Sequence, residues 1–504
     1  MIDLAAYGGS WYAAHAADAP ERGRLTVETD VDVCVIGGGL AGLTAAREVA
    51  RRGWSVALIE ARRIAWNASG RNMGVVSPGF AADQAAIVDR VGADRAKALW
   101  GLSVAGAEYV RRALRECRMP GVEYGAAGWL HVSKTDSGRE IAIRAQMLEA
   151  EYGAEVEFWP AERVRDALKS ALYFAAIHHT RAFTINPLNY ALGLAAAAEA
   201  AGARIYENTP AISLDPDGVL KRIATSSARL RARHVVIAGN VQIGNLMPKL
   251  TRTLVPVWTY VMVTAPLGER LRDAVAFRGG ISDEFLSNSH YRVVGGDRLM
   301  WSGYPTVWSG TPGRRIEALK ADIARAYPQL GDVEAEFCWG GVLGNTLHSM
   351  PQIGELSLGV WVASGFGGHG LNTTAMAGEL IARAIVEGDD TYRLFAPFEL
   401  IWAGGTLGRA AVQLYSWSRS RYERFANARA LKRETQQPPP AVTEEPTLVA
   451  EPEAPPAMDA PRRERSRKRK KSSVAVPTAA APIEENSATS TSNLPPPDKQ
   501  TVGG

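Results

Sequence analysis

Short apolar runs and a helix-forming stretch alternate near the start of the chain. Residues 31–36 form a short run of mostly β-branched apolar residues with Asp32 near its start, which is typical of a strand buried on both faces of a parallel sheet. Good helix formers follow from residue 40 to residue 52, and Gly53 is a helix stop signal. A second buried-strand pattern covers residues 55–59. This order predicts a β–α–β unit of an α/β fold.

The turn between the first strand and the helix matches G-x-G-x-x-G at Gly37, Gly39 and Gly42. These glycines permit a tight turn, the close approach of a pyrophosphate, and close packing of the helix on the strand. The helix N-terminus offers N–H groups to the phosphates. Glu60, 23 residues after Gly37, is placed to accept hydrogen bonds from ribose hydroxyls. We therefore expect an ADP-containing dinucleotide, bound by Gly37, Gly38, Gly39, Leu40, Ala41, Gly42, Glu60, Ala61 and Arg62.

A second G-x-G-x-x-G match lies at residues 365–370, between a strand-like run at 360–363 and a helical stretch at about 372–387. No strand ending in a ribose-binding acid follows, so this segment is not a second dinucleotide-binding unit. A helix start with permissive glycines suits the pyrimidine edge of a flavin, and close backbone packing is the alternative interpretation. A nicotinamide-dependent dehydrogenase would need further strand–helix repeats after Glu60, whereas a polar loop follows here.

The composition of the chain changes abruptly near residue 436. From there to the end the chain is rich in Pro, Ala, Glu, Ser and Thr without periodicity, so we expect residues 436–504 to be disordered. A basic block occupies residues 462–471. A solvated tail is the favoured interpretation of this block, and contact with nucleic acid or an anionic membrane is the alternative.

Whole-chain composition excludes several classes of protein. The chain has 504 residues, of which 46% are hydrophobic and 22% charged, with a formal net charge of +4. These values suit a large packed core and give no support for a basic protein. Three cysteines cannot form a disulfide framework or an all-thiolate zinc site, so we expect a reducing, cytoplasmic location and no metal. No apolar run reaches the length of a membrane-spanning helix, so none is expected.

The loop after Glu60 carries a specific family resemblance. Residues 12–74 resemble the start of the D-amino-acid-oxidase-like (DAO) superfamily of FAD-dependent amine oxidoreductases, and within it the gamma-glutamylputrescine oxidoreductases and the glycine and sarcosine oxidases. In that branch a loop of the form G-A-S-G-R-N-G-G lies along the flavin. Asn67 and Met73 stand here in place of glycines of that pattern. The resemblance implies FAD contacts at Ser69, Gly70, Arg71, Asn72, Met73 and Gly74.

Later motifs follow the order that the family shows along its chain. The resemblance implies that the backbone near Ala211 faces the adenine and that Ala238 and Gly239 lie beside the nucleotide. It also implies contact of Gly365, Gly367, Gly368, His369 and Gly370 with the isoalloxazine.

The fold that the resemblance implies is α/β, with a Rossmann-like FAD-binding domain interleaved with a mixed-sheet substrate domain. The expected parts are an arm at 1–28, FAD-binding segments at 29–80, 181–250 and 336–395, substrate-domain segments at 81–180 and 251–335, a C-terminal helical segment at 396–435 and the tail at 436–504.

The activity that the resemblance implies is oxidation of the C–N bond of an amine or amino acid to an imine. The expected substrates are gamma-glutamylputrescine-like amines, N-methyl amino acids or D-amino acids, and FAD would be reoxidised by O2 or another acceptor. The flavin carries the difficult chemistry, so the protein supplies orientation, electrostatics and water exclusion. A strand at residues 255–263 and a hairpin at 289–301 would border the substrate. The candidate catalytic residues are His369, His348, Tyr291, Arg292 and Tyr260, with loop, packing or surface roles as the alternatives.

Two residues bear on how the flavin is attached and reoxidised. Sarcosine-oxidase-like relatives use a lysine above the flavin for oxygen reactivity, and Trp301 falls near that position here. Some relatives tether FAD through a cysteine, and Cys338 is displaced from the corresponding point, so we expect non-covalent FAD. The alternative for the whole chain is an FAD-binding scaffold or regulatory protein whose tail binds nucleic acid or an anionic membrane.

Overall fold

Two β-sheets and the helices packed on them make up the described chain. The computed structural model describes residues 7–125, 127–135, 137–283 and 289–436. The contacts join residues 1–439 into one unit, and every element named below belongs to it. The predicted disorder of the tail and its basic block concern residues beyond Gln436, outside the described ranges.

The predicted β–α–β unit forms the centre of the first sheet, which has eight strands. β1 (Thr29–Ile36) lies between β10 (Arg229–Ile237) and β2 (Val56–Ile59) and is parallel to both. The strand order is β16-β17-β10-β1-β2-β7, and β9 joins β10 and β8 at the side. The other strands are β7 (Arg204–Tyr206), β8 (Ser213–Asp215), β9 (Lys221–Ala224), β16 (Gln352–Ser357) and β17 (Val360–Ser364).

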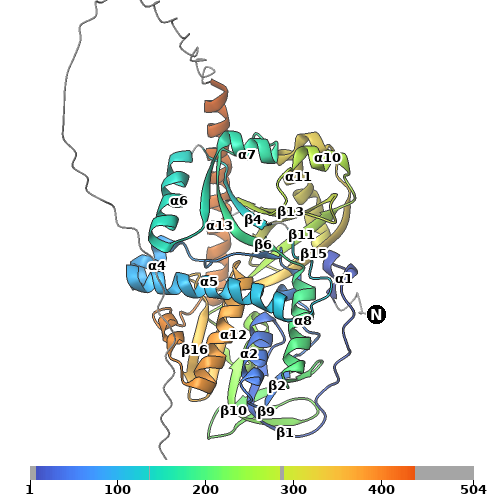
Figure 1. Ribbon diagram of the computed structural model, residues 1–504, viewed down its shortest axis with the longest axis vertical. Helices are drawn as coiled ribbons and strands as arrows, with labels where there is room; N and C mark the ends of the chain where they lie inside the picture. The colour runs from blue at the N-terminus through green and yellow to red at the C-terminus, as the bar shows by residue number, and fades with distance from the viewer. Residues whose placement is uncertain (1–6, 126, 136, 284–288, 437–504) are drawn as a thin grey trace, which may run out of the picture. The chain divides into compact units, whose positions relative to one another are not determined.

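Neighbouring side chains of β1 are buried on opposite faces of this sheet. Val33 and Val35 belong to the core under four helices, whereas Cys34 and Ile36 belong to the core on the other side. In Figure 1, α2, α8 and α12 lie beside one another and α5 runs across them. The helices are α2 (Leu40–Arg51), α5 (Ala93–Glu116), α8 (Pro187–Ala200) and α12 (Gly370–Glu387). The short segments η2 (Asn240–Leu246) and α9 (Pro248–Thr251) cover the second face.

The second sheet has nine strands and is mostly antiparallel. Its order is β15-β11-β14-β13-β12-β4-β6-β3, with β5 paired to β6, and β4 and β12 are the parallel pair. The strands are β3 (Val75–Val76), β4 (Ala127–Ser133), β5 (Val156–Pro160), β6 (Ala175–Thr184), β11 (Val255–Thr264), β12 (Gly280–Asp283), β13 (His290–Val294), β14 (Arg298–Thr306) and β15 (Ala335–Asn345).

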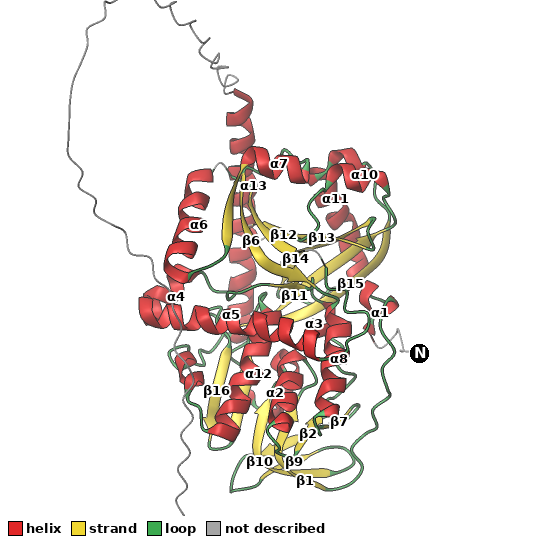
Figure 2. Ribbon diagram, viewed as in Figure 1, coloured by secondary structure: helices red, strands yellow, loops and turns green. Residues whose placement is uncertain are grey.

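The two faces of the second sheet differ in chemistry. Figure 2 shows α7 (Ala161–Leu168), α10 (Glu269–Ala274) and α11 (Ile316–Ala326) beside the second sheet. Tyr260, Tyr291 and Trp301 are buried on the face that these helices cover. His131 and His290 occupy alternate positions on their strands, so they lie on the opposite face. That face carries these polar side chains beside apolar ones of the main core, such as Val261 and Met300. It belongs to the side of the sheet that carries the candidate site described below.

The remaining helices are short or peripheral, apart from the last. They are α1 (Trp11–Ala14), α3 (Ala68–Arg71), α4 (Gln84–Val91), α6 (Gly138–Tyr152), η3 (Pro312–Arg315), η4 (Pro328–Leu330), η5 (Thr391–Phe395) and α13 (Gly405–Gln436). No helix among the described residues combines the length and hydropathy needed to span a membrane.

The structure confirms the predicted fold class, because it is a mixed α/β arrangement with two sheets. Strands of the first sheet come from three separate stretches of chain, at 29–59, 204–237 and 352–364. β3 and β15 both belong to the second sheet, where β3 pairs with β6 and β15 pairs with β11. β3 falls within a predicted FAD-binding segment, and β15 begins at the edge of another. The domain boundaries given above remain a prediction.

Candidate active site

The glycine turn after β1 has no room for side chains at two of its positions. At Gly37, φ is +116°, and a Cβ atom would lie 2.8 Å from the carbonyl carbon of Ala238. A Cβ atom on Gly42 would lie 2.0 Å from the carbonyl oxygen of Gly37, so α2 packs directly on the turn. The N-cap position of α2 has no side-chain cap, and the Leu40 N–H donates to Ser69 Oγ at 3.1 Å. The first turn of α2 thus presents N–H groups at the carboxyl end of β1.

Glu60 follows β2, and backbone groups hold both of its carboxylate oxygens. Oε2 accepts a hydrogen bond from Gly38 N at 2.6 Å, and Oε1 accepts one from Arg62 N at 2.8 Å. The side chain is buried, and this burial raises the pKa of the Glu60 carboxyl, while the two N–H donors act in the opposite direction. Glu60 is therefore oriented beside the glycine turn, where the motif predicts a ribose acceptor.

The loop at residues 67–74 is shaped by Asn72. Its Nδ2 donates to the carbonyl oxygens of Ala68 and Ser69 at 3.0 Å each, and its Oδ1 accepts from Gly74 N at 2.9 Å. Gly70 has no room for a side chain, since a Cβ atom would lie 2.4 Å from the carbonyl oxygen of Ala65. One amide side chain thus fixes the turn that the family resemblance assigns to the flavin.

Arg71 ties this loop to the second sheet. Its Nη1 donates to the carbonyl oxygen of Gly340 at 2.9 Å, and its own carbonyl accepts from Trp339 Nε1 at 3.0 Å. Burial lowers the pKa of Arg71. Its Nε is buried without a hydrogen-bond partner among the described residues. A buried donor without a partner is costly, so this atom indicates a group that the protein binds here.

The second glycine segment leaves open space at the start of α12. Gly367 has φ of +59°, and its N–H donates to Gly344 O at 3.0 Å. At Gly368 and Gly370, no atom of the described chain lies within 4 Å of the position that a Cβ atom would take. Together with the uncapped start of α2, the fixed Glu60 carboxylate and the unpartnered Arg71 Nε, this space fits a flavin dinucleotide.

His369 stands at the end of the second glycine segment, and its ring has a defined orientation. Nε2 lies 3.0 Å from Pro78 O and 3.1 Å from Ser77 Oγ. Because a carbonyl oxygen only accepts, Nε2 carries the hydrogen, and Nδ1 of the neutral ring carries the lone pair. Burial lowers the pKa of His369, which favours this neutral ring.

Three more histidines join His369 around Trp129, and we call these four the histidine cluster: His131, His179, His290 and His369. Trp129 stacks on the rings of His131 and His179, with centroids 5.5 and 4.8 Å apart, and meets the ring of His369 edge-on at 6.0 Å. Trp129 Nε1 donates to Ser282 Oγ at 2.8 Å, and Ser282 Oγ lies 2.5 Å from His290 Nδ1. The cluster therefore joins β4, β6, β13 and the start of α12, and Ser282 of β12 connects Trp129 to His290.

The histidine cluster is held in its neutral form. Burial, with a smaller contribution from Arg144, lowers the pKa of His131 to about 4. Burial, with the neighbouring rings of His131 and His369, lowers the pKa of His179 to about 3. The pKa of His290 is also lowered by burial. Near pH 7 these rings offer hydrogen-bonding nitrogens without positive charge.

Comparison with known proteins decides the family. The family model described as "DAO: FAD dependent oxidoreductase" matches residues 32–384 of the chain. The protein belongs to the DAO family. This DAO-family protein is an FAD-dependent oxidoreductase, and its cofactor is FAD.

Relatives agree with this assignment at moderate sequence identity. The chain is 29% identical over 401 residues to the gamma-glutamylputrescine oxidoreductase of Escherichia coli, covering 77% of this chain and 91% of the relative. It is 26% identical over 377 residues to the probable oxidoreductase OrdL of Haemophilus influenzae, covering 74% and 86%. The crystal structure of glycine oxidase from Geobacillus kaustophilus is similar in fold, with a TM-score of 0.62 and 20% identity over 74% of this chain and 99% of that one.

Two of the candidate catalytic residues of this DAO-family protein lie away from the histidine cluster. Tyr291 is buried on the helix-covered face of the second sheet, where its hydroxyl lies 2.9 Å from Tyr173 Oη and 2.8 Å from Tyr327 Oη. Tyr260 is buried on the same face. Trp301 stacks on Tyr291 with ring centroids 4.2 Å apart, so it too lies on this face.

Arg292 lies on the histidine side of β13 but binds the protein itself. Its Nη2 donates to Ile185 O at 3.1 Å and to Tyr12 Oη at 3.3 Å, and the residue is buried. The Cβ position of Gly74 would be 3.1 Å from the same nitrogen, so Arg292 packs under the loop at 67–74. The structure brings Arg292 together with the predicted flavin loop, and its contacts tie that loop to α1 and to the end of β6.

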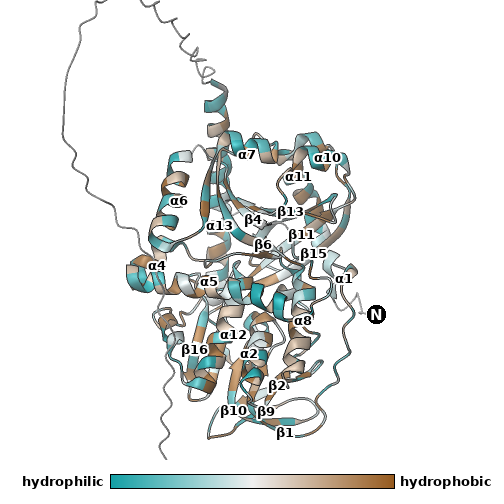
Figure 3. Cartoon of the chain, in the orientation of Figure 1, coloured by the Kyte–Doolittle hydropathy of each residue, from teal (hydrophilic) through white to brown (hydrophobic). Residues whose placement is uncertain are grey.

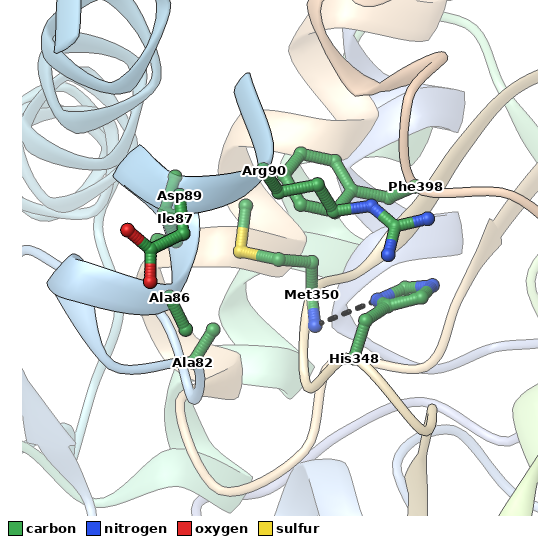
Figure 4. A pocket seen from close by; sticks show the side chains of 8 residues that line it. All are labelled: Ala82, Ala86, Ile87, Asp89, Arg90, His348, Met350 and Phe398. Atoms are coloured by element: carbon green, nitrogen blue, oxygen red, sulfur yellow. Dashed lines mark hydrogen bonds between the residues drawn. The ribbon is translucent and has the colours of Figure 1, made fainter. Parts of the chain in front are cut away.

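His348 lies outside the histidine cluster, in a surface cavity of about 450 Å³ that Figure 4 shows. Its Nδ1 accepts from Met350 N at 3.1 Å, so Nε2 carries the hydrogen and donates to Glu399 O at 3.2 Å. Both ring nitrogens thus hold the loop before β16. Arg90 and Phe398 line the same cavity, with the guanidinium 5.7 Å from the ring centroid.

The other predicted cofactor residues gather near the same edge of the first sheet. Gly365 N donates to Asn240 Oδ1 at 3.3 Å, which joins the second glycine segment to the residues directly after Ala238 and Gly239. Ala211 lies beyond a loop in which Thr209 N donates to Glu60 O at 2.8 Å, and it packs on the second core of this sheet. Met73 packs against the main core. Cys338 pairs with Met262 in the sheet, and burial raises the pKa of its thiol to about 11.

Sequence reasoning missed most of the histidine cluster. The alternation of Trp129 and His131 along one strand was a signal that both face the same side. Their assembly with His179 and His290 depends on which strands pair. Trp129 pairs with His179 across β4 and β6, whereas the Trp129–Ser282 bond, which leads to His290, joins residues 153 apart. No local pattern in the sequence reports that pairing.

Proposed function

We propose that this protein oxidises the C–N bond of an amine or amino acid to an imine, with FAD held between the glycine turns and the histidine cluster. The observation that carries the proposal is the meeting of His369, at the second glycine segment, with Trp129 on the second sheet. A substrate bound there would lie between the predicted flavin contacts and a neutral polar surface. Gamma-glutamylated amines, glycine and D-amino acids are the substrates to test first, since related proteins bear such names, and N-methyl amino acids, which the family resemblance implies, come next.

The residues that would hold FAD follow from the contacts described above. The first turn of α2 would bind the pyrophosphate, Glu60 the ribose hydroxyls, and the loop of Ser69, Gly70, Arg71, Asn72, Met73 and Gly74 the flavin. Arg71 Nε would find its missing acceptor there. The open positions at Gly368 and Gly370 would face the ring. We infer non-covalent attachment, because Cys338 lies beside Met262 on the face of β15 away from Trp339.

When bound, FAD supplies an acceptor for two electrons from the substrate C–H bond. The protein must then hold the substrate nitrogen as a neutral amine, because its lone pair forms the C=N bond as the hydride leaves. The histidine cluster serves this need through burial, which disfavours an ammonium ion just as it lowers the pKa values of the rings themselves. His369 Nδ1 is the acceptor that we assign to the amine N–H.

The first test of the proposal is anaerobic reduction of the purified yellow holoprotein by a panel of amines and amino acids. We expect bleaching of the flavin by at least one member of the panel, and a peroxide assay in air would separate O2 from another acceptor. A protein that binds FAD and is reduced by no member of the panel would favour the scaffold or regulatory alternative. Flavin that stays with acid-precipitated protein would contradict non-covalent attachment.

The role of His369 is tested by substitution. His369→Leu removes the acceptor and should slow flavin reduction, measured per bound FAD, about 10- to 100-fold, the effect of losing a hydrogen bond in a buried site. His369→Gln keeps an acceptor and should recover part of that rate. Rapid-mixing absorbance under anaerobic conditions measures both variants.

The matched control is His348→Gln, a second histidine of lowered pKa outside the histidine cluster. Its reduction rate should stay within about twofold of the parent rate, as expected for a change away from the reacting atoms. Equal losses in the His348 and His369 variants would refute a specific role for His369.

We infer a reducing compartment for the protein, with the cytoplasm as the expected location. Cys34, Cys117 and Cys338 are free thiols, and Cys34 is buried in the first sheet. Disulfide bonds therefore contribute nothing to the stability of the described chain.

A further inference from the structure

The last helix, α13, is fixed to the rest of the protein along one side. Gln413 Oε1 accepts hydrogen bonds from Thr306 Oγ1 at 2.9 Å and from Val307 N at 3.0 Å. Farther along, Asn427 Nδ2 donates to Lys134 O, and Glu434 forms an ion pair with Arg165. α13 begins after the stretch that the family model matches, which ends at residue 384. It therefore lies outside the stretch that the family model matches.

The other side of α13 carries large apolar side chains that the described chain leaves exposed. Leu407, Leu414, Trp417 and Phe425 are 84%, 66%, 62% and 60% exposed. Their spacing places them on one side at 3.6 residues per turn, with Tyr415 and Tyr422 beside them. We call these six residues the apolar stripe. Figure 3 shows hydrophobic and hydrophilic positions interspersed along α13.

Positive charges border the apolar stripe and also interrupt it, since Arg421 and Arg429 fall on the same side of α13. The guanidinium of Arg419 lies 5.7 Å from the ring centroid of Tyr422, and that of Arg429 lies 5.5 Å from the centroid of Phe425. Arg421, Arg424 and Arg433 are exposed on the same helix. The two carboxylates of α13 are turned elsewhere, since Glu423 is buried beside Arg419 and Glu434 pairs with Arg165.

We propose that the apolar stripe of α13 binds the surface of an anionic lipid bilayer. Leu, Trp and Phe side chains enter the boundary between headgroups and acyl chains, Tyr hydroxyls lie at the headgroups, and the bordering arginines meet lipid phosphates. A second copy of the chain fits this surface less well. A twofold contact would place the arginines of one stripe against those of the other, without carboxylates to pair them.

The sequence beyond α13 adds a second membrane signal. Residues 462–471 contain the basic residues Arg462, Arg463, Arg465, Arg467, Lys468, Arg469, Lys470 and Lys471, outside the described ranges. Stable membrane binding generally requires two weak signals, such as an inserted apolar surface and a polybasic segment. The alternative interpretation of this block, contact with an anionic membrane, agrees with the proposed role of the apolar stripe. Nucleic acid offers no apolar phase for the stripe.

Co-sedimentation of the full-length holoprotein with vesicles tests the proposal. The protein should pellet with vesicles of phosphatidylcholine and phosphatidylglycerol in a 7:3 ratio, and far less with phosphatidylcholine alone. Added salt should weaken binding, because it screens the arginines.

The variant L414Q/W417Q/F425Q should raise the half-saturating lipid concentration about tenfold or more, since it removes most of the inserted area. The variant K468Q/R469Q/K470Q/K471Q should lose a salt-sensitive part of the binding.

Leu358→Gln is the matched control, because Leu358 is also an exposed apolar residue but lies in the turn between β16 and β17. It should bind vesicles like the parent. All variants should keep their FAD content and their amine-dependent flavin reduction, so a failure of membrane binding is distinct from a failure of the proposed reaction. No pelleting of the parent, unchanged binding by the triple variant, or a dimer that the triple variant dissociates would overturn the proposal.

Discussion

At the scale of single residues, two neighbouring carboxylates, Glu60 and Glu207, differ in whether the sequence predicts their position. Glu60 is predictable, because it ends the second strand of a local β–α–β unit. Glu207 is not, although its Oε1 accepts from Ile64 N at 2.8 Å and its Oε2 pairs with Arg63 Nε at 2.9 Å. Glu207 is buried and holds the segment directly after Glu60. Its partner Ile64 is 143 residues away in the chain, so no local pattern marks it.

Glu60→Gln should weaken FAD binding. The amide keeps one acceptor oxygen, but its NH2 group would face a backbone N–H of Gly38 or Arg62. We expect the FAD dissociation constant to rise about 10- to 100-fold, since charged hydrogen bonds are worth ~1.5–3 kcal/mol. Titration of the apoprotein with FAD measures this, with the exposed Glu28→Gln as the control that should bind normally. Equal affinities for all three proteins would contradict the assignment of Glu60.

The histidine cluster predicts a pH dependence of stability. His179 titrates at about 3 in the folded protein, against about 6.5 in an unfolded chain. As the pH falls below that unfolded value, the unfolded state binds a proton that the folded state refuses, so stability decreases until the folded ring protonates. At pH 5 this effect of one ring is up to about 2 kcal/mol.

His179→Gln should therefore flatten the loss of stability between pH 6.5 and pH 4. Urea unfolding at a series of pH values measures the slope, and the double variant H131Q/H179Q should flatten it further. A slope equal to that of the parent in both variants would show that these rings are not kept neutral by the fold.

At the scale of elements, the contact between α2 and α12 depends on one glycine. A Cβ atom on Gly378 of α12 would lie 2.5 Å from Thr44 Cβ and 2.7 Å from Ala45 N of α2. The two helices therefore approach each other closely above the first sheet, and the start of each of them contributes to the candidate FAD site. Sequence periodicity predicted both helices but did not predict that they contact each other.

Gly378→Ala should destabilise the protein by about 1–3 kcal/mol, because the helices must move apart to accept the methyl group. The matched control is Gly101→Ala in α5, where no described atom lies within 4 Å of the added Cβ. That change should be neutral or stabilise by up to about 1 kcal/mol, since alanine restricts the unfolded chain. Urea unfolding of both holoproteins measures the difference, and equal effects would show that the close contact has no energetic cost.

For the hairpin of β13 and β14, the sequence predicts the strands but not which of their faces carries the candidate site. The sequence predicted its two strands but proposed Tyr291 for the substrate side, whereas His290 is the residue that joins the histidine cluster. Adjacent residues of a strand point to opposite faces. Both faces of this sheet are covered in part, so apolar patterning does not tell which face carries the site.

At the scale of the described unit, the order of motifs was enough to predict two sheets with interleaved chain segments. The glycine turns and Glu60 were found because each is defined within about 25 residues of sequence, the length of a β–α–β unit. The histidine cluster was missed because β4 and β6 are distant in sequence from β12 and β13. The placement of β15 in the second sheet depends likewise on its pairing with β11.

The central position of β1 has a consequence for synthesis of the chain. β1 needs β10 on one side, and the pair Asp30–Arg231 at their ends is separated by 201 residues. At ~5–20 residues per second, a ribosome takes about 10–40 seconds to make that stretch. During this interval β1 has an unpaired edge of backbone N–H and C=O groups, which other nascent chains can pair with. Temperature and translation speed should therefore decide how much of this protein is recovered folded.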